Sequence, residues 1–249
     1  GEYAGIIPVD FSGYPVDMER LRKIADRYNL WIIEDACHAP GGYFIDSNGE
    51  KENCGNGKYA ELAIFSFHPV KHIASGEGGM ITTNNEGLYK KLLFLRTHGI
   101  TKDESLMSEN HGSWYYEMID LGYNYRLTDI QCALGMSQLK RADKNIKLRN
   151  QIANNYIQAF QNNDFKLQKI KDNIYHAYHL FIIQTNRRKQ LYDYLRQNNI
   201  YAQVHYIPAH LQPFYKNKGF KKGDFPIAEA YYEKCLSLPL YPTLKDDEQ

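Results

Sequence analysis

Two short apolar runs constrain the fold of this chain more than any other feature. The runs are Leu30–Asp35 (LWIIED) and Leu62–Phe67 (LAIFSF), in which most residues are apolar. In a half-buried strand, apolar and polar residues would alternate. Runs of this kind are typical of parallel strands that helices cover on both faces. Before the first run, apolar residues recur at helical spacing in Asp17–Tyr28, after a short apolar run at Ile6–Val9. The pattern predicts a βαβ unit and an α/β fold with a mainly parallel sheet.

Turn-forming residues separate the next predicted elements of this sheet region. Residues Gly41–Tyr59 are rich in Asn, Gly and Lys, and their Asn48-Gly49 pair favours a tight hairpin turn. Gly78–Asn84 (GGMITTN) is another β-rich run, and helical composition follows from Glu86 to Leu95. We therefore expect a surface excursion, a further strand and a helix, in this order.

A long helical stretch leads out of this region. Thr128 and Gln131 form a capping box, which predicts a helix start. Helical composition continues to about Phe160, with a break expected near Ala142-Asp143. A separate α+β set of a strand, a helix and a strand then follows, at His176–Thr185, Arg187–Gln197 and Tyr201–Tyr206.

The sequence predicts two domains. Residues 1–142 would form the C-terminal part of a large sheet domain, and residues 143–249 a small α+β domain. The chain opens with a strand-like apolar run and no initiator Met, and it ends in PTLKDDEQ, a composition that starts helices. We expect it to be an internal portion of a longer protein, so that any site it builds is incomplete.

Composition excludes several classes of function. With 30 Lys and Arg against 29 Asp and Glu, the net charge of +1 gives no field to attract nucleic acid or an anionic membrane. Neither an apolar membrane-spanning run nor a signal peptide is present in the sequence, and a cytoplasmic location is expected. The four cysteines lie far apart without a C-x-x-C pair, so neither a disulfide framework nor a metal site is predicted.

Asp35 and Lys71 carry the chemical signal. Asp35 ends a buried strand, where open α/β sheets place their ligand crevice, and Lys71 follows the next buried strand. A helix N-cap or turn role explains Asp35 alone equally well. A pyridoxal phosphate (PLP) enzyme explains both residues, because it needs a lysine for a Schiff base and a carboxylate against the pyridine nitrogen.

Neighbouring residues fit the same site with less specificity. Ser66 can donate its hydroxyl to a phosphate oxygen, although serines at strand ends are often merely solvated. The glycines at Gly76, Gly78 and Gly79 let the backbone pass close to a ligand or simply form a turn. His38 can hydrogen-bond a cofactor or substrate, although a structural role suits its turn better, and the histidines lack the spacing of metal ligands.

Four stretches together resemble a known family. They are IEDACHAPGG, AIFSFHPVKHIASGEGGMITTN, LGYNYRLTDIQCALGMSQLKR and AQVHYIPAHLQP. In order and spacing they resemble the PLP-dependent sugar-nucleotide aminotransferases of the DegT/DnrJ/EryC1/StrS family, over nearly the whole chain. The resemblance implies a fold-type I PLP-dependent transferase that forms homodimers, with each active site at the subunit interface.

The resemblance also implies roles by position. Lys71 would be the catalytic Schiff-base lysine, Asp35 the partner of the pyridine nitrogen, His38 a neighbour of the cofactor ring and Ser66 a phosphate ligand. Asn124 would reach the phosphate of the neighbouring subunit's cofactor. On the substrate side, Arg126 suits the carboxylate of an amino donor, and His205 and Tyr206 lie where the family approaches the sugar nucleotide. Ordinary surface or strand-end roles remain open for these last three.

The implied activity moves an amino group from an amino acid, glutamate being expected, to C4 of a UDP-linked 4-keto-6-deoxy-N-acetyl hexose, in pseudaminic acid biosynthesis. Two alternatives stay open: another 4-keto sugar nucleotide as acceptor, or a non-catalytic dimerising or ligand-binding remnant. Deoxygenating relatives carry histidine where this chain has Lys71, which argues against that chemistry. Members of the family also have an N-terminal segment with a phosphate-binding turn and a ring-stacking aromatic, which this chain lacks.

Overall fold

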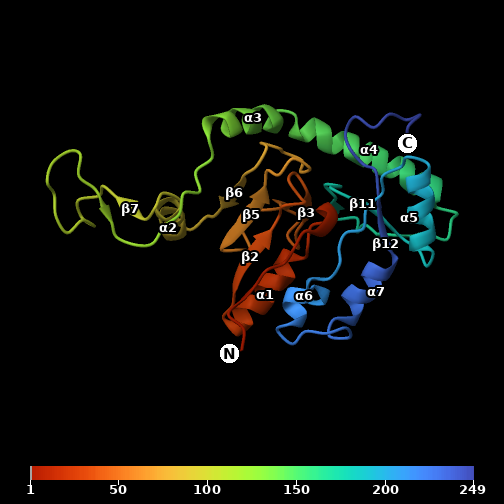
Figure 1. Cartoon of the computed structure of the whole chain (residues 1–249), viewed down its shortest axis with the longest axis horizontal. Helices are drawn as coiled ribbons and strands as arrows, with labels where there is room; N and C mark the ends of the chain where they lie inside the picture. The colour runs from red at the N-terminus through yellow and green to blue at the C-terminus, as the bar shows by residue number, and fades with distance from the viewer. Residues whose placement is uncertain (1) are drawn as a thin grey trace.

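A central mixed sheet organises the first half of the molecule, in a computed structural model that describes residues 2–249 (Figure 1). Its strand order is β1-β2-β5-β6. Strands β1 (Gly5–Ile6), β2 (Trp31–Asp35) and β5 (Leu62–Ser66) run parallel, and β6 (Gly79–Thr82) pairs antiparallel with β5. The expectation of an α/β fold with a mainly parallel sheet is confirmed.

Helix α1 (Met18–Tyr28) connects β1 to β2 and forms for local reasons. The Asp17 carboxylate accepts a hydrogen bond from the backbone N–H of Arg20, which caps the first turn, and Asn29 ends the helix in a left-handed conformation. Its buried residues Met18 and Ala25 pack in one core cluster with Ile32 of β2. Burial of this face fixes the helix against the sheet.

A small antiparallel sheet lies beside the central one, in the order β10-β3-β4. Strands β3 (Tyr43–Ile45) and β4 (Lys51–Asn53) form the hairpin predicted from Asn48-Gly49, and Gly49 has the positive φ that its turn requires. The third strand, β10 (Ile174–Tyr175), comes from far along the chain and pairs with β3. A strand from the predicted second domain, residues 143–249, therefore completes a sheet of the predicted first domain, residues 1–142.

An arm projects from the central body (Figure 1). It contains α2 (Glu86–Arg96) and the two-stranded ribbon of β7 (Ile100–Thr101) and β8 (Glu117–Met118). The chain then enters α3 (Asp129–Leu139), and the predicted Thr128–Gln131 capping box is present. The predicted helix break is also found, because α4 (Ala142–Phe160) begins separately after Lys140 and Arg141.

The second region is built around α4 and a three-stranded antiparallel sheet in the order β12-β11-β9. Its strands are β9 (Lys166–Leu167), β11 (Phe181–Gln184) and β12 (Cys235–Leu238). Ile152, Ala153 and Tyr156 on one face of α4 pack into the core of this sheet. The remaining elements are α5 (Arg188–Gln197), α6 (Pro213–Lys216), α7 (Pro226–Lys234), and the 3-10 turns η1 (Phe11–Gly13) and η2 (Ala209–Leu211).

Two predicted strands of this region are wrong in part. The strand expected at His176–Thr185 begins only at Phe181, because residues before it bond to the η1 turn instead of to a sheet. The stretch Tyr201–Tyr206 makes a single bridge, Gln203 to Ser237, and not a strand. Beyond that bridge, the His205 ring bonds to the Ser237 hydroxyl and not to the backbone ladder.

Within residues 2–249, no helix is both long and apolar enough to cross a membrane. All four cysteines are free thiols, with Cys54 and Cys235 buried.

Candidate active site

The parallel strands end at one edge of the central sheet, and Asp35 lies there. Its backbone N–H donates to the Pro8 carbonyl (2.8 Å), and its own carbonyl accepts from the Asp10 N–H (3.0 Å). On the other side, Asp35 pairs in parallel register with Ile64 of β5. The Asp35 carboxylate accepts a hydrogen bond from the Cys37 N–H (3.0 Å). This side chain is therefore held at the carboxyl ends of three neighbouring strands.

Lys71 lies on a closed loop between β5 and β6. The Phe67 N–H donates to the Gly78 carbonyl (2.8 Å), the Ser75 N–H donates to the Phe67 carbonyl (2.9 Å), and the Lys71 N–H donates to the His68 carbonyl (2.9 Å). Gly79 lets the strands close, because a Cβ there would lie 2.7 Å from the Phe65 carbonyl oxygen. The backbone fixes where Lys71 leaves the chain.

The beginning of α3 supports this loop from outside. The Gln131 side-chain amide, besides its part in the capping box, donates to the Glu77 carbonyl (3.0 Å). A Cβ on Gly78 would meet Leu127 at 2.5 Å, which shows how closely that segment packs on the loop. The capping box thus positions the lysine loop as well as starting a helix.

The pKa of Lys71 depends on its surroundings, Asp35 among them. Burial lowers the pKa of the half-buried Lys71, while the charges of Cys37 and Asp35 act to raise it. Burial, followed by its hydrogen bond and charge interaction with Asp35, raises the pKa of the Cys37 thiol to about 12. No ion pair engages the Lys71 amine anywhere in residues 2–249. The Lys71 amine is therefore partly desolvated and lies within range of the Asp35 charge.

Two histidines belong to the same cluster. Burial, then the positive charge of Lys71, lowers the pKa of His38 to about 4. The pKa of His205 is lowered by the same two causes, and its Nδ1 lies 2.8 Å from the Ser237 hydroxyl. The structure thus brings Asp35, His38, Lys71 and His205 together from separate parts of the chain.

Ser66 and Tyr206 lie at the margin of this cluster. Ser66 ends β5, and its hydroxyl oxygen accepts a hydrogen bond from the His68 N–H (3.3 Å). The Tyr206 ring, half exposed, lies 6.2 Å from the ring of Phe11, which in turn lies 6.0 Å from His38. The aromatic rings of Phe11 and Tyr206 therefore lie beside His38. Phe11 was not among the residues predicted from the sequence.

Asn124 and Arg126 lie elsewhere. Both are exposed on the segment that returns from the arm to α3, where Asn124 forms an isolated bridge with Thr97. Neither influences the pKa of Lys71, His38 or His205. The roles expected for these two residues stay predictions.

A buried acidic pair, Asp10 and Glu34, was also missed. It forms a group with Cys54 in which one polar atom of each residue lies within 4.8 Å of the others. The signal for it was the glutamate inside the apolar run LWIIED. A second acidic group, Asp46, Glu50 and Glu52, is already paired with the Lys58 amine.

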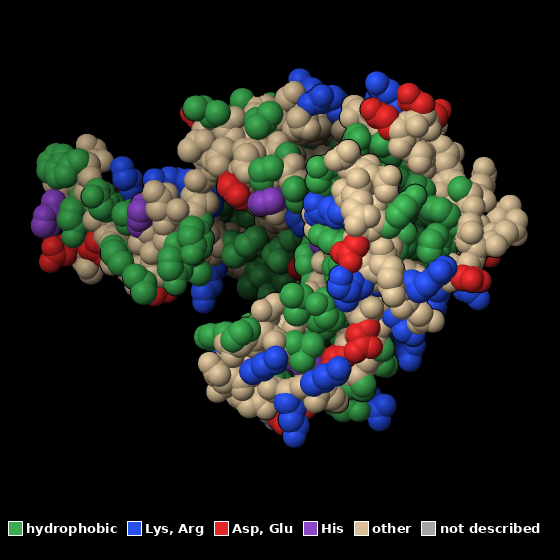
Figure 2. Space-filling view, turned by 45° about the vertical axis from the view of Figure 1, so that its right-hand side comes forward, with side chains coloured by type: hydrophobic (Ala, Val, Ile, Leu, Met, Phe, Trp, Pro, Cys, Tyr) green, Lys and Arg blue, Asp and Glu red, His purple; other side chains and the backbone are tan. Residues whose placement is uncertain are grey.

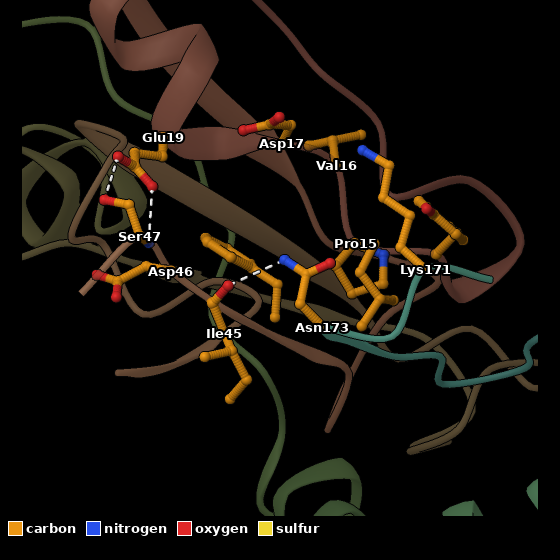
Figure 3. Close-up of a pocket in the computed structure, with 12 residues that line it drawn as sticks. Pro15, Val16, Asp17, Glu19, Ile45, Asp46, Ser47, Lys171 and Asn173 are labelled. Carbon is orange, nitrogen blue, oxygen red and sulfur yellow. Dashed lines mark hydrogen bonds between the residues drawn. The ribbon is translucent and has the colours of Figure 1, made fainter. Parts of the chain in front are cut away.

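A separate cavity of about 280 Å³ lies between the start of α1 and the β3–β4 hairpin (Figure 3). Glu19, Asp46 and Lys171 are among its lining residues, and the Asn173 amide donates to the Ile45 carbonyl (3.0 Å) beside it. None of the Lys71 cluster lines this cavity in the described chain. Its chemistry is that of a polar surface recess.

The model of the DegT/DnrJ/EryC1/StrS aminotransferase family matches residues 2–249. The chain belongs to this family. It is 43% identical to the uncharacterized protein MJ1066 of Methanocaldococcus jannaschii, covering 98% of this chain and 63% of that protein. It is 39% identical to the UDP-4-amino-4,6-dideoxy-N-acetyl-beta-L-altrosamine transaminase of Campylobacter jejuni, covering 96% and 61%.

Solved structures agree with this assignment. Helicobacter pylori PseC, an aminotransferase involved in the biosynthesis of pseudoaminic acid, matches with a TM-score of 0.85 and 30% identity, covering 98% of this chain and 63% of that one. The fold is that of fold-type I PLP-dependent aminotransferases, and members of this family use PLP. The chain spans less than two thirds of the length of these relatives.

Proposed function

We propose that this chain carries the lysine-bearing part of a PLP-dependent sugar-nucleotide aminotransferase. The observation that supports it best is the position of Lys71 and Asp35 at the carboxyl edge of the parallel strands, where the Asp35 charge acts on the pKa of Lys71 and both residues act on the pKa of Cys37. Family membership favours the same reaction class.

The residues present fit the cofactor. Lys71 is half buried, and its lowered pKa increases the fraction of neutral amine that can attack an aldehyde. Asp35 offers a carboxylate in the same space, and Ser66 ends the strand that leads into the lysine loop. Lys71 would hold PLP covalently, Asp35 would face its ring nitrogen, and Ser66 would bind its phosphate.

Bound PLP supplies an electron sink for the cleavage of a Cα–H bond. The chain supplies the proton transfer: the Lys71 amine, once free, takes a proton at Nζ and returns it, acting as general base and then acid. Asp35 stabilises positive charge opposite its carboxylate. His38, held neutral by burial and by Lys71, adds no competing cation beside the amine.

The proposed substrates follow the named relatives. The amino acceptor is a UDP-linked 4-keto-6-deoxy-N-acetyl hexose aminated at C4 in pseudaminic acid biosynthesis, and the donor is an amino acid, glutamate first. We assign His205 and Tyr206 to the sugar-nucleotide side, because they border the Lys71 cluster from the second region. The cytoplasmic location expected from the sequence stays a prediction.

We propose a second copy of the protein as partner. Apolar side chains gather on the arm, in plain view in Figure 2. Those more than half exposed include Leu106, Trp114, Tyr116, Met118, Leu121 and Tyr125. Asn124 and Arg126 are exposed on the segment that returns from this arm to α3, outside the Lys71 cluster. A homodimer would bury these apolar groups and bring Asn124 and Arg126 to the partner's site.

Lys71→Ala tests the proposal. The protein containing this chain is titrated with PLP, reduced with borohydride and digested, and the modified peptide is identified by mass spectrometry. We expect one adduct on Lys71, together with a visible absorbance band, in the unaltered protein, and loss of both in the variant. Turnover should fall by more than about 10²-fold, because both attachment and proton transfer are lost.

Lys91→Ala is the matched control, because Lys91 is exposed on α2 away from the cluster. It should keep the absorbance band and the Lys71 adduct. An unaltered band in Lys71→Ala, or an adduct on another lysine, would refute the assignment. Mass spectrometry of products from a panel of 4-keto UDP- and dTDP-sugars then tests the acceptor separately from the cofactor.

A further inference from the structure

The ring of His179 lies directly against the ring of His38. Their centroids are 4.3 Å apart with an interplanar angle of 37°, and each side chain is 7% exposed. His179 also lies 5.4 Å from the ring of His72, the residue after Lys71. One imidazole from the segment before β11 therefore touches both the Asp35 turn and the lysine loop.

Backbone hydrogen bonds fix the segment that carries His179. The Ala177 N–H donates to the Gly13 carbonyl (2.8 Å), and the Leu180 N–H donates to the Ser12 carbonyl (3.2 Å). Gly13 permits this approach, because a Cβ there would lie 2.8 Å from the Tyr178 nitrogen and 2.9 Å from the His38 carbonyl oxygen. The η1 turn and the His179 segment therefore form one tightly packed unit.

Arg149 holds the same segment from the other side. Its guanidinium donates from Nη1 to the carbonyl oxygens of Tyr178 (3.1 Å), His179 (3.4 Å) and Leu240 (3.1 Å). Arg149 is 6% exposed and lies on α4, so that the helix of the second region fixes the backbone beneath His179. Burial, and to a smaller extent this cation, lowers the pKa of His179.

The tautomer of His38 is set in the same place. The Ser12 N–H donates to Nδ1 of His38 (3.3 Å), and only an unprotonated Nδ1 can accept it. The neutral ring therefore carries its proton on Nε2. Ser12 is held by the bond from Leu180, one residue after His179.

We propose that His179 is a positioning residue for the Lys71 site: its ring excludes water from one face of His38 and, with the Ser12 N–H, keeps that imidazole neutral, in one tautomer and in one orientation. This inference rests on the proposed function for its catalytic consequence, but its structural part concerns His38 alone. Contact with the reacting atoms is not assigned to His179.

The charges around His38 explain why the backing ring matters. Lys71 and His205 disfavour a charged His38, and Asp35 favours it. Burial is the largest influence and holds the pKa of His38 at about 4. If water entered in place of the His179 ring, the ordinary pKa of about 6.5 would be approached. A second cation would then form beside Lys71 at a higher pH than in the unaltered protein.

His179→Ala and His179→Phe test the proposal by ¹⁵N NMR of His38 in the cofactor-free protein. The unaltered protein should show the neutral Nε2–H tautomer down to about pH 4. His179→Phe keeps a ring and should leave that behaviour unchanged. His179→Ala should raise the titration midpoint of His38 by about 1 to 2 pH units and move the acid limb of the pH–rate profile by the same amount.

An unchanged His38 titration in folded His179→Ala, or an Nδ1–H tautomer in the unaltered protein, would overturn the inference. Circular dichroism establishes folding, and His179→Gln replaces the alanine variant if that one unfolds. Because the NMR readout needs no PLP, failure of the Lys71 adduct experiment would refute the proposed function and leave this measurement intact. An altered His38 in His179→Phe would likewise contradict the role given to the ring.

Discussion

Asp10 and Glu34 bury two carboxyl groups side by side. Asp10 is 0% exposed and Glu34 is 4% exposed, and no cation pairs with either in the described residues. The Asp10 carboxylate accepts from the Val16 N–H and that of Glu34 from the Gly55 N–H, both at 2.9 Å. Burial raises the pKa of Asp10 to about 6, and burial and the Asp10 charge raise that of Glu34 to about 8. The pair therefore holds a proton at neutral pH.

This pair predicts that stability falls as the pH rises. An acid whose pKa is higher in the folded than in the unfolded chain stabilises the fold fully below its unfolded value, and that contribution is lost as the pH rises through the folded value. For Glu34 the window runs from 4.5 to about 8. Between pH 5 and pH 9, we expect the contribution of the pair, measured in urea as the difference in free energy of unfolding between the unaltered protein and Glu34→Gln, to drop by about 2–4 kcal/mol.

Glu34→Gln should flatten this dependence, because the amide stays neutral and can still donate to Asp10. Glu233→Gln, at an exposed glutamate on α7, should leave it as it is. Equal slopes for Glu34→Gln and the unaltered protein would show that the pair is not the source.

Among single residues, the sequence predicted those whose position depends only on where a strand ends. Asp35 and Lys71 each follow a buried parallel strand, so their convergence could be predicted from topology. Asp10 and His179 could not be, because their partners depend on side-chain packing between distant segments. For Glu34 the carboxylate within an apolar run was a usable signal, since a charge in a buried strand requires a partner.

The α4 helix joins the two regions, and its buried face can be tested at the scale of an element. Ile152 is 5% exposed within the core cluster around β11, whereas its neighbour Gln151 is exposed. Ile152→Ala should lower the free energy of unfolding by about 2–4 kcal/mol, because it leaves a cavity. Gln151→Ala should change it by less than about 0.5 kcal/mol. Chemical denaturation checks both, and equal effects would mean that this face does not carry the core.

Helices were predicted better than strands, for a physical reason. The start of α3 at its Thr128 cap and the end of α4 at Phe160 follow from local capping and periodicity. A strand exists only with a partner in space, and β propensity depends on that context. Residues 176–180 therefore bond to the η1 turn in place of a sheet, and Tyr201–Tyr206 keeps only the Gln203–Ser237 bridge.

For the molecule as a whole, much apolar surface has no cover within residues 2–249. Helix α3 has no buried residue, and its Ile130 is 83% exposed. The arm, which projects from the central body (Figure 1), carries further apolar side chains (Figure 2). Surface of this extent is more than scattered exposure on a monomer explains. It supports the proposal of a second copy, which the sequence suggested only through family resemblance.

A shared active site makes a prediction that a monomeric site does not. If Lys71 of one subunit works with Asn124 of the other, Lys71→Ala and Asn124→Ala are each inactive alone, yet a mixed dimer contains one site with both residues intact. Random reassortment of equal amounts would give about half mixed dimers, and so about a quarter of the unaltered number of working sites.

The measurement is amino transfer by the two full-length variants, before and after mild dissociation and mixing. Lys71→Ala mixed with Lys91→Ala, Asn124 being unaltered in both, should keep half of full activity with or without exchange, and so controls for activity lost during dissociation and mixing. Recovery near a quarter of full activity requires that each chain complete its neighbour's site through the arm. If the mixture stays inactive although exchange is demonstrated, Lys71 and Asn124 must act within one subunit, and the exposed arm would need another explanation.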